Sequence, residues 1–476
     1  MSNKPDAVII GSGPNGLAAG ITLARAGLKV VIREGHATAG GGMRSASLTL
    51  PGFVHDVCST VQALARVSPF FRSIPLDQLG VTFCEPPAPF AHALDGGDAA
   101  ICERSVQATA AGLGADGKSY ERLFAPLVED WDRLIPTLLG PPYQIPRAPV
   151  ALARFGWNAI RSVRSLADAK FTSPAARALF AGVAAHAILP FDFIASASFG
   201  MVLTASAHAV GWPVVKGGSG VLADALVRHF QSLGGSVETS APVTTLDEFA
   251  GVKAILADVA PRNLVKIAGA ALPHRYQKRL NAFRYGPGVF KIDYALSQPI
   301  PWKNPALLRA GTIHLGGTFE EIARSEGDSW QGRQPANPYV LLVQSSLFDP
   351  TRARAGQHTA WAYMHVPHGT NVDLTNTMET QIERFAPGFR ECVLARAVRN
   401  GAQLEAENAN LIGGDITGGA NMFSQLFTRP VRQINPYRTP VKGLYLCSAS
   451  TPPGGGVHGM CGVNAAKSAL KHEFGM

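Results

Sequence analysis

A glycine-rich turn near the start of the chain has the spacing of a phosphate-binding loop. Residues 11–16 read G-S-G-P-N-G and directly follow the apolar run 6–10. The three glycines suit three different roles, namely a tight turn, close approach of bare backbone to a pyrophosphate, and close packing of helix against strand. The free N–H groups and dipole of the helix that follows attract phosphate. We therefore expect a dinucleotide to bind at Gly11, Ser12, Gly13, Pro14, Asn15 and Gly16.

A carboxylate and a second glycine run extend this candidate site. Glu34 ends the apolar run 28–33, roughly 20 residues after the loop, where a carboxylate accepts hydrogen bonds from ribose hydroxyls. The run Gly40-Gly41-Gly42 then offers bare backbone to a long cofactor, and the arginine that follows offers a cation to its diphosphate. The cofactor site is therefore expected to include Gly35, Gly41, Gly42, Met43 and Arg44.

The elements around these motifs predict an α/β fold. Residues 6–10 and 28–33 read as buried parallel strands, joined by a helix that ends at Gly27. This βαβ order is the beginning of a doubly wound, Rossmann-type sheet. The end of the chain repeats the order of strand, glycine turn and helix. A second G-x-G-x-x-G unit is not found, so we expect one bound dinucleotide and no separate NAD(P)H domain.

The remaining segments predict an inserted domain. The section from about 105 to 215 reads as mostly helical, and 236–246 and 254–260 read as strands. From 285 to 366 the apolar residues alternate as in an antiparallel sheet, and a helix is expected near 374–400. We predict a discontinuous nucleotide-binding domain of residues 1–105, 212–285 and 405–476, and an inserted α+β substrate domain of residues 106–211 and 286–404.

Composition excludes several classes of protein. Of the 476 residues, 46% are hydrophobic and only 16% are charged, which excludes intrinsic disorder. The net charge of +9 is spread without a basic block, so no nucleic-acid partner is expected. The six cysteines form no C-x-x-C pair, which favours a reduced, cytoplasmic protein without a metal site. No signal peptide is expected, and the low-charge run 178–215 is interrupted by Pro190 and histidines, so no membrane-spanning helix is expected.

Long stretches of the chain resemble a known family. The opening AVIIGSGPNGLAAGITLARAGLKVVIRE, the segments GGGMRS and LPGFVHDVCS, and the closing GLYLCSASTPPGGGVHGMCGVNAA resemble the phytoene-dehydrogenase-like FAD oxidoreductases. This family includes bacterial carotenoid desaturases and pyridine-nucleotide-disulfide-oxidoreductase-domain proteins, and KGGSGVLADALVRHFQSLGG is similar to the latter. The resemblance implies a glutathione-reductase-like FAD-binding domain, FAD in the cleft beside the substrate domain, and chemistry on an apolar, often polyene, substrate.

The resemblance also implies roles for individual residues. It places the loop glycines on the diphosphate, Glu34 on the adenosine ribose, and the backbone of Val243 beside the adenine. The final helix, beginning near Gly459, would direct its dipole at the flavin and stabilise the negative charge of the reduced ring. The flavin end of the site would be formed by Ser448, Gly456, Val457, His458, Gly459 and Met460.

Two departures from the family pattern concern residues 448–454. Carotenoid desaturases usually carry a G-A-G-T-H-P-G-like run, whereas this chain reads S-A-S-T-P-P-G. This difference argues against carotenoid desaturation itself. The acidic residue with which amine oxidases bind the ribityl chain is also absent, with Ser448 to Ser450 in its place, which argues against an amine oxidase.

Hydride transfer to flavin N5 can require a base, and two histidines are candidates. His458 stands in the glycine loop expected to face the flavin ring, and His55 follows the first glycine hairpin. The alternative for His458 is a hydrogen bond to loop backbone. Cys461 reads as a small buried residue, and the remaining histidines considered read as packed or surface residues: His186, His208, His365 and His368.

The expected function is an FAD-dependent dehydrogenase, desaturase or isomerase. Its substrate would be an isoprenoid, polyene or acyl-type lipophile, and oxygen or a quinone would reoxidise the flavin. The alternatives are a flavin amine oxidase and a non-enzymatic binding protein on the same fold, as in the prenyl-GTPase dissociation inhibitors. A basic amphipathic stretch with Arg147, Arg154, Arg161 and Arg164 is either a peripheral membrane contact or a solvated helix face, and the oligomeric state stays open.

Overall fold

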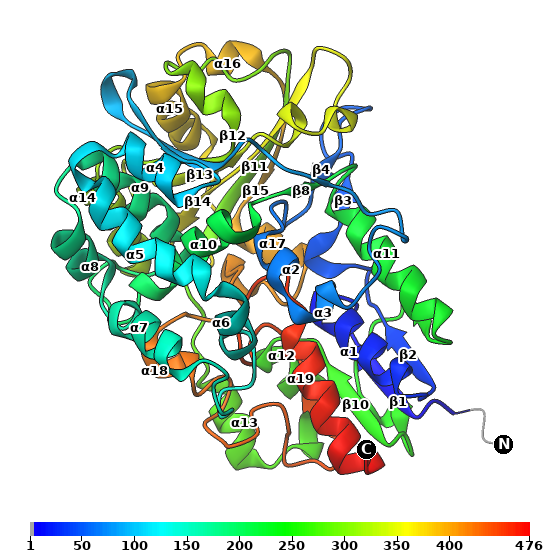
Figure 1. Ribbon diagram of the computed structural model, residues 1–476. Helices are drawn as coiled ribbons and strands as arrows, with labels where there is room; N and C mark the ends of the chain where they lie inside the picture. The colour runs from blue at the N-terminus through cyan, green and yellow to red at the C-terminus, as the bar shows by residue number, and fades with distance from the viewer. Residues whose placement is uncertain (1–3) are drawn as a thin grey trace.

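A computed structural model describes residues 4–476, which form two sheets with helices packed against both (Figure 1). The first sheet has five strands in the order β16-β10-β1-β2-β9, and every pair is parallel. Its strands are β1 (Ala7–Ile10), β2 (Val30–Arg33), β9 (Ser236–Glu238), β10 (Ala254–Ala257) and β16 (Leu444–Leu446). The central strand β1 consists of four buried apolar residues, as a parallel strand covered on both faces requires.

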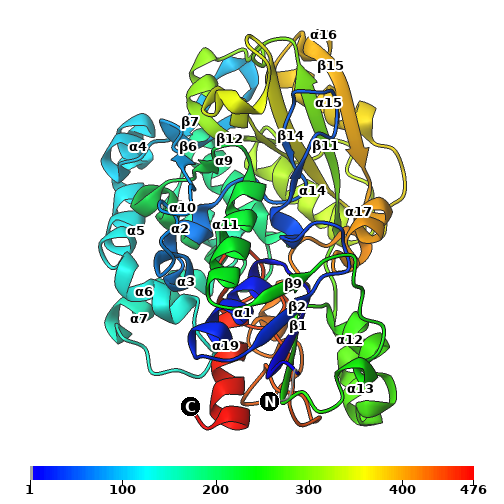
Figure 2. The ribbon, with the colours of Figure 1, turned by 90° about the vertical axis from the view of Figure 1, so that its right-hand side faces the viewer.

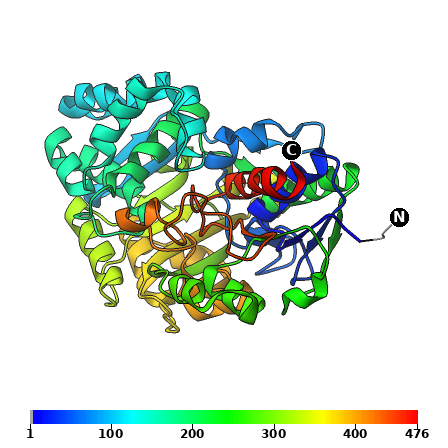
Figure 3. The same ribbon diagram turned by 90° about the horizontal axis from the view of Figure 1, so that it is seen from below.

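Helices from distant parts of the chain cover both faces of this sheet. On one face lie α1 (Pro14–Arg25), α11 (Ser219–Ser232) and α19 (Met460–Ala469), and Figure 3 shows α1 and α19 side by side. The backbones of α1 and α19 are in direct contact at Gly462, where a Cβ would lie only 1.8 Å from the carbonyl oxygen of Asn15. The other face packs against α12 (Pro261–Ala268) and α13 (His274–Asn281), chiefly through Val8, Leu264 and Leu280.

The second sheet has seven strands in the order β15-β11-β14-β13-β12-β6-β7 and occupies the opposite end of the molecule (Figure 2). Its pairs are antiparallel except β12 with β6. The strands are β6 (Ala88–Ala93), β7 (Ala99–Cys102), β11 (Gly288–Leu296), β12 (Ala310–Leu315), β13 (Val340–Val343), β14 (His358–Val366) and β15 (Val393–Arg399). One face of the sheet is apolar, and the other faces α9 (Pro174–Ala184) and α14 (Phe319–Trp330).

Short elements connect the two sheets. The hairpin β3 (Ser45–Ala46) and β4 (His55–Asp56) follows the 3-10 turn η1 (Gly41–Met43), and β5 (Phe83–Cys84) pairs with β8 (Val214–Val215). The remaining helices are α2 (Ala63–Val67), α3 (Pro69–Arg72), α4 (Val106–Gly112), α5 (Gly117–Glu129), α6 (Trp131–Leu138), α7 (Pro149–Ala159), α8 (Val163–Lys170), α10 (Ala197–Val210), α15 (Thr375–Phe385), α16 (Phe389–Cys392), α17 (Gly401–Glu407) and α18 (Phe423–Leu426). No helix among residues 4–476 is both long and apolar enough to cross a membrane.

The predicted α/β class with a Rossmann-type sheet is confirmed, but three segments differ from expectation. The helix predicted near 374–400 ends as α15 and α16, and 393–399 form the strand β15, because this alternating run pairs with β11. The strand predicted over 236–246 ends at Glu238, so Val243 lies in a loop. The strands β6 and β7, which we assigned to the nucleotide-binding part, pair with the second sheet through β12. The domain boundaries themselves stay a prediction.

Candidate cofactor site

The loop between β1 and α1 brings bare backbone into contact with bare backbone. Gly11 has φ +97°, and a Cβ on Gly16 would lie 2.1 Å from the carbonyl oxygen of Gly11. A Cβ on Gly13 would lie 2.8 Å from the carboxyl oxygen Oδ2 of Asp258. The first turn of α1 carries no acidic residue, so its dipole is not offset from within the helix. This cradle has the shape and electrostatics that a diphosphate requires.

Asp258 lies beneath the loop, and the sequence signals did not reveal it. Its Oδ2 accepts a hydrogen bond of 2.8 Å from the backbone N–H of Gly16, at the first turn of α1. Burial, together with the nearby charge of Glu34, raises the pKa of Asp258 to about 7, although the hydrogen bond from Gly16 opposes the shift. The one signal in the sequence was an aspartate directly after the apolar strand β10, at the carboxyl edge of the sheet. Near neutral pH this carboxyl can therefore be a neutral neighbour of the phosphates rather than a competing anion.

Glu34 connects the end of β2 to the glycine loop. Its Oε2 accepts hydrogen bonds from the backbone N–H of Ser12 at 2.9 Å and from the Ser12 hydroxyl at 2.6 Å. Its Oε1 accepts from the backbone N–H of His36 at 2.8 Å. The carboxylate is thus fixed beside the glycine loop at the end of β2, and its contact with a ribose stays a prediction.

Glu34→Gln is expected to weaken FAD binding by roughly 10–100-fold, because hydrogen bonds to a charged group contribute about 1.5–3 kcal/mol. The dissociation constant is measured by titrating the apoprotein with FAD and monitoring the quenching of flavin fluorescence. The matched control is Glu238→Gln one strand away, where the carboxylate is half-exposed and pairs with Arg33. Unchanged FAD affinity in Glu34→Gln would refute the ribose assignment.

The second glycine run packs directly on the first. The backbone N–H of Gly40 donates to both oxygens of Ser12, and a Cβ on Gly41 would lie 2.8 Å from the Cα of Gly13. Arg44 donates from Nε to the carbonyl of Gly41 at 3.0 Å, and Gly42 accepts two hydrogen bonds from Ser59. The structure therefore brings together both predicted glycine segments, with Arg44 beside them and Met43 buried below.

The remaining adenosine-side predictions lie close to Glu34 but outside regular structure. A Cβ on Gly35 would be 3.5 Å from the side chain of Pro242. Val243 follows Pro242 in the loop after β9 and packs against the apolar cluster below the sheet. The expected strand is absent there, and the contact of Val243 with an adenine stays a prediction.

The loop before α19 contains the predicted flavin-side residues. Gly454, Gly456 and Gly459 all have positive φ, so the chain turns sharply before the helix begins at Met460. Both ring nitrogens of His458 are engaged by backbone: Nε2 lies 3.1 Å from the carbonyl of Gly454, and Nδ1 accepts from the N–H of Met460 at 3.0 Å. Burial lowers the pKa of His458 to about 4. These contacts favour a histidine that shapes the loop over one that accepts a substrate proton.

Other predicted residues of this loop are also structural in their contacts. Ser448 is buried, and its hydroxyl accepts from the N–H of Ser450 at 3.4 Å, while Val457 is partly buried among the apolar core. The Cys461 thiol donates to the carbonyl of Thr451, and burial raises its pKa to about 12. The Cys461 thiol is therefore unreactive at neutral pH.

The second catalytic candidate, His55, is buried on β4. Its Nε2 lies 2.7 Å from the hydroxyl of Thr49, and its Nδ1 lies 3.9 Å from Oδ1 of Asp293, which pairs with Lys291. Burial, and then the charge of Lys291, lower the pKa of His55 to about 4. His55 is consequently neutral and adjoins a buried ion pair on β11.

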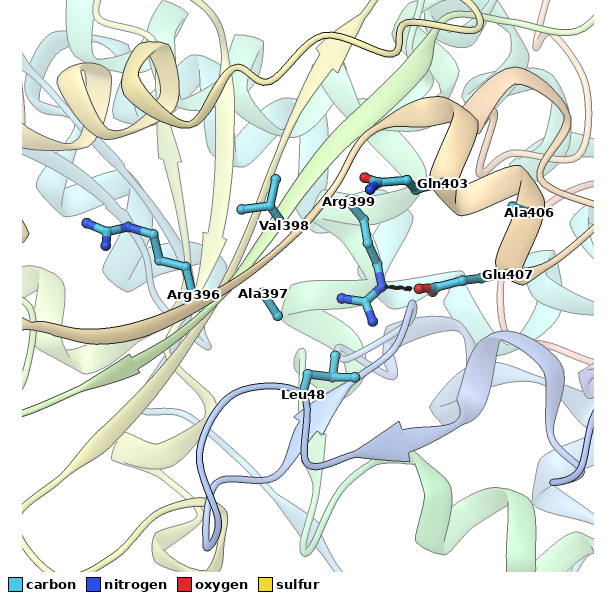
Figure 4. Close-up of a pocket in the computed structure, with 8 residues that line it drawn as sticks. All are labelled: Leu48, Arg396, Ala397, Val398, Arg399, Gln403, Ala406 and Glu407. Carbon is cyan, nitrogen blue, oxygen red and sulfur yellow. Dashed lines mark hydrogen bonds and ion pairs between the residues drawn. The ribbon is translucent and has the colours of Figure 1, made fainter.

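A pocket of about 380 Å³ opens where the hairpin β3–β4 meets the edge strand β15 and helix α17 (Figure 4). It is lined by Leu48, Arg396, Ala397, Val398, Arg399, Gln403, Ala406 and Glu407. Arg399 crosses it, donating from Nε to both carboxylate oxygens of Glu407 at 2.6 and 2.8 Å. Leu48 lies in the hairpin that follows Arg44 and precedes His55, so the pocket borders the candidate site although it contains none of the predicted residues.

These residues fit a bound dinucleotide such as FAD. The cradle would be filled by any Cβ, and the carboxyl below it can be neutral. Glu34 lies at the end of the site expected to hold the ribose, and the loop of residues 454–459 leads to the N-terminus of α19 at the opposite end. Within residues 4–476 no group of three or more His, Cys, Asp or Glu side chains is arranged to hold a metal ion.

Comparison with known proteins agrees with this geometry. The family of NAD(P)-binding Rossmann-like domains matches residues 9–73. The mouse pyridine nucleotide-disulfide oxidoreductase domain-containing protein 2 is 26% identical, covering 97% of this chain and 92% of its own length. The zeta-carotene-forming phytoene desaturase of Myxococcus xanthus is 25% identical, covering 94% and 90%.

Among solved structures, an engineered variant of putrescine oxidase superposes with a TM-score of 0.63 at 16% identity, covering 98% of each chain. At that identity the likeness concerns the fold alone. The sequence relatives extend over nearly the whole chain, and the resemblance to the phytoene-dehydrogenase-like oxidoreductases that the motifs indicated is therefore confirmed.

Proposed function

We propose that the protein is an FAD-dependent oxidoreductase, a dehydrogenase, desaturase or isomerase, that acts on a hydrophobic isoprenoid, polyene or acyl-type substrate. The observation that carries the proposal is the double glycine cradle, with Glu34 fixed beside it and a second glycine loop leading into α19. The full-length similarity to an oxidoreductase-domain protein and a phytoene desaturase supports the same class. When bound, FAD would supply the two-electron acceptor at N5.

The chain's own groups have distinct roles in this proposal. The N–H groups of the first loop bind the diphosphate, and Glu34 binds the ribose. Arg44 places a cation along the cofactor, and the dipole of α19 stabilises negative charge on the reduced ring. Oxygen or a quinone serves as the electron acceptor.

An absorption spectrum followed by anaerobic bleaching tests the proposal. We expect the purified or reconstituted protein to show flavin bands that disappear when a lipid extract or candidate polyene is added without oxygen. Bleaching by small amines, but by no lipophile, would support the amine oxidase alternative instead. A protein that cannot be reconstituted with FAD would support the alternative of a non-enzymatic binding protein.

We also propose a peripheral contact with an anionic membrane, because of the apolar side chains around α7. Ile145, Val150 and Trp157 are 93%, 73% and 79% exposed, and Arg147 lies among them. The basic stretch forms two helices, α7 and α8, and Arg154 and Arg164 pair with acidic residues, which weakens the purely electrostatic argument. Co-sedimentation with phosphatidylglycerol but not phosphatidylcholine vesicles tests this contact.

A further inference from the structure

The two faces of the seven-stranded sheet differ in chemistry. Along β11, Phe290 and Ile292 point into the apolar cluster on one side, so that Lys291 and Asp293 lie on the other. The same alternation along β14 places Ala362 and Met364 on the apolar side and Trp361, Tyr363 and His365 opposite. We call this second side the polar face; it also carries His92, Thr312, His314 and Tyr339, and α9 and α14 pack against it.

Aromatic rings form a continuous row across the polar face. Ring centroids lie 5.1 Å apart for Trp361 and Tyr363, 5.5 Å for Tyr363 and His365, and 5.3 Å for His365 and Tyr339. The row continues through His314, at 5.9 Å from Tyr339, to His186 at 5.1 Å.

One end of this row lies beside the cofactor turn. The strand β14 contacts the hairpin strand β4, which ends two residues before Cys58, and the Cβ of Cys58 lies 3.7 Å from where a Cβ on Gly42 would be. The row therefore connects the second glycine run to the interior of the substrate part of the molecule.

Many polar atoms on this face have no hydrogen-bond partner. Within residues 4–476, the buried atoms without a partner include His92 Nδ1, Asp293 Oδ1, Thr312 Oγ1, His314 Nδ1, Trp361 Nε1 and His365 Nε2. Leaving such a group unpaired typically costs about 1–3 kcal/mol. The same side also carries Phe90, Val289, Leu341 and Val343 in the apolar core, so the six atoms are polar positions in an otherwise apolar wall. Such a wall suits a ligand with an apolar body and a few polar groups.

His365 has the geometry of an oriented imidazole. Its Nδ1 lies 2.7 Å from Oε1 of Glu326 on α14, and both side chains are buried. With Glu326 accepting a hydrogen bond from Nδ1–H, Nε2 keeps a free lone pair. His458 differs from His365 in that backbone groups occupy both of its ring nitrogens.

The neighbouring histidines are neutral. Burial lowers the pKa of His92 to about 4 and that of His186 to about 3, and also lowers that of His314. Neutral imidazoles, a hydroxyl and an indole N–H form hydrogen bonds with uncharged oxygen groups. A plain hydrocarbon would leave these atoms unpaired.

We propose that the polar face is the substrate-binding wall and that Nε2 of His365 accepts a hydrogen bond from a hydroxyl of the substrate, with Glu326 as its positioning residue. The substrate is then an oxygenated lipophile rather than a bare hydrocarbon, bound with its apolar body against the row of rings. This inference rests on the proposed function and narrows its substrate class.

Farnesol and farnesene test the inference: they share one isoprenoid skeleton, and farnesene has one more C=C bond in place of the hydroxyl. The FAD-reconstituted protein is titrated with each without oxygen, and changes in the flavin spectrum and in tryptophan fluorescence give two dissociation constants. We expect farnesol to bind at least about tenfold more tightly. His365→Phe removes this preference, whereas the control His358→Gln, on the same strand, retains it.

Glu326 is tested separately as the positioning residue. Glu326→Ala is expected to lose the preference for farnesol, and Glu326→Gln, which still accepts a hydrogen bond from Nδ1, to restore most of it. A merely structural role predicts equal weakening for both lipophiles.

The inference is overturned if neither lipophile binds, if farnesene binds as tightly as farnesol, or if His365→Phe keeps the preference. Uptake of FAD is recorded first, so a protein without flavin bands refutes the proposed function on its own. The tryptophan signal still reports binding in that case. Bleaching of a loaded protein by hydrocarbons alone would leave the function standing and refute the oxygenated substrate.

Discussion

Gly16→Ala is expected to leave the purified protein without bound flavin. A Cβ at this position would lie 2.1 Å from the carbonyl oxygen of Gly11, and the obstacle is backbone that cannot rotate away. To relieve the clash, the first turn of α1 must move away from β1, which removes its N–H groups from the diphosphate. Overpacking of this kind typically costs about 1–3 kcal/mol. The ratio of flavin to protein absorbance measures the loss of cofactor, and the urea midpoint measures the loss of stability.

Gly327→Ala is the matched control for this change. Gly327 lies within α14, and a Cβ there would have no atom within 4 Å. Alanine in a helix interior is favoured over glycine by about 1 kcal/mol, so this variant should keep its flavin and unfold no earlier than the wild type. Full flavin occupancy with wild-type affinity in Gly16→Ala would show that the cradle is not the phosphate site.

Asp258→Asn is expected to remove a pH dependence of FAD binding. The carboxyl of Asp258 accepts a hydrogen bond from the N–H of Gly16 and has a pKa of about 7. Raising the pH through 7 therefore adds its negative charge to that of Glu34 beside the diphosphate site. Wild-type affinity should therefore fall with rising pH, by at most about tenfold per unit above pH 7 for one linked proton. Asparagine still accepts the hydrogen bond from Gly16 but carries no charge, so its affinity should stay level.

The charged neighbours of Asp258 do not provide an alternative source of this effect. Glu34 is the carboxylate whose charge acts on it, and burial raises the pKa values of Cys447 and Cys461, which stay neutral thiols.

The raised pKa of Asp258 also makes the stability of the folded protein depend on pH. Because the folded pKa lies above the ordinary value of 3.8, stability contributed by this group is present below pH 4 and declines as the pH rises to about 7. The asparagine variant should thus gain stability over the wild type at pH 8 but not at pH 4.

Fluorescence titrations with FAD between pH 5.5 and 8.5 measure the affinities of both proteins. Calorimetry in two buffers of different ionisation enthalpy counts the protons taken up on binding. We expect uptake near pH 7.5 in the wild type and none in the variant. Identical pH slopes in the two proteins would contradict the role of Asp258.

The cofactor half of the site could be predicted from the sequence because its signals are local. Gly11 to Gly16, Glu34 and Gly41 lie within one strand–turn–helix–strand unit, where spacing alone determines position. Asp258 is distant in sequence and reaches Gly16 only because Ala257 pairs in register with Ile10. His365 and Glu326 likewise lie on a strand and a helix whose contact is tertiary. No local sequence signal links Asp258 to Gly16 or Glu326 to His365.

Two segments pair in the structure in ways that local sequence signals did not predict. Residues 393–399 contain leucine, alanine and arginine, which favour helices, yet pairing with β11 extends them into a strand. β6 and β7 follow the nucleotide-binding unit in sequence, but the parallel pairing of β6 with β12 brings them into the other sheet. Long-range pairing overrode both local propensity and order along the chain.

The strand order of the five-stranded sheet determines how late in translation the sheet can be completed. β1 and β2 leave the ribosome first, but β9 and β10, which pair with them, begin only at Ser236 and Ala254. The edge strand β16, which pairs with β10, begins at Leu444, and α19 extends to Ala469. The growing chain therefore carries an unsealed apolar sheet edge through most of translation, which is a state that chaperones bind and that aggregates. On the proposed function, cofactor loading follows the synthesis of α19, and a chain cut short before α19 leaves the packing surface of α1 uncovered.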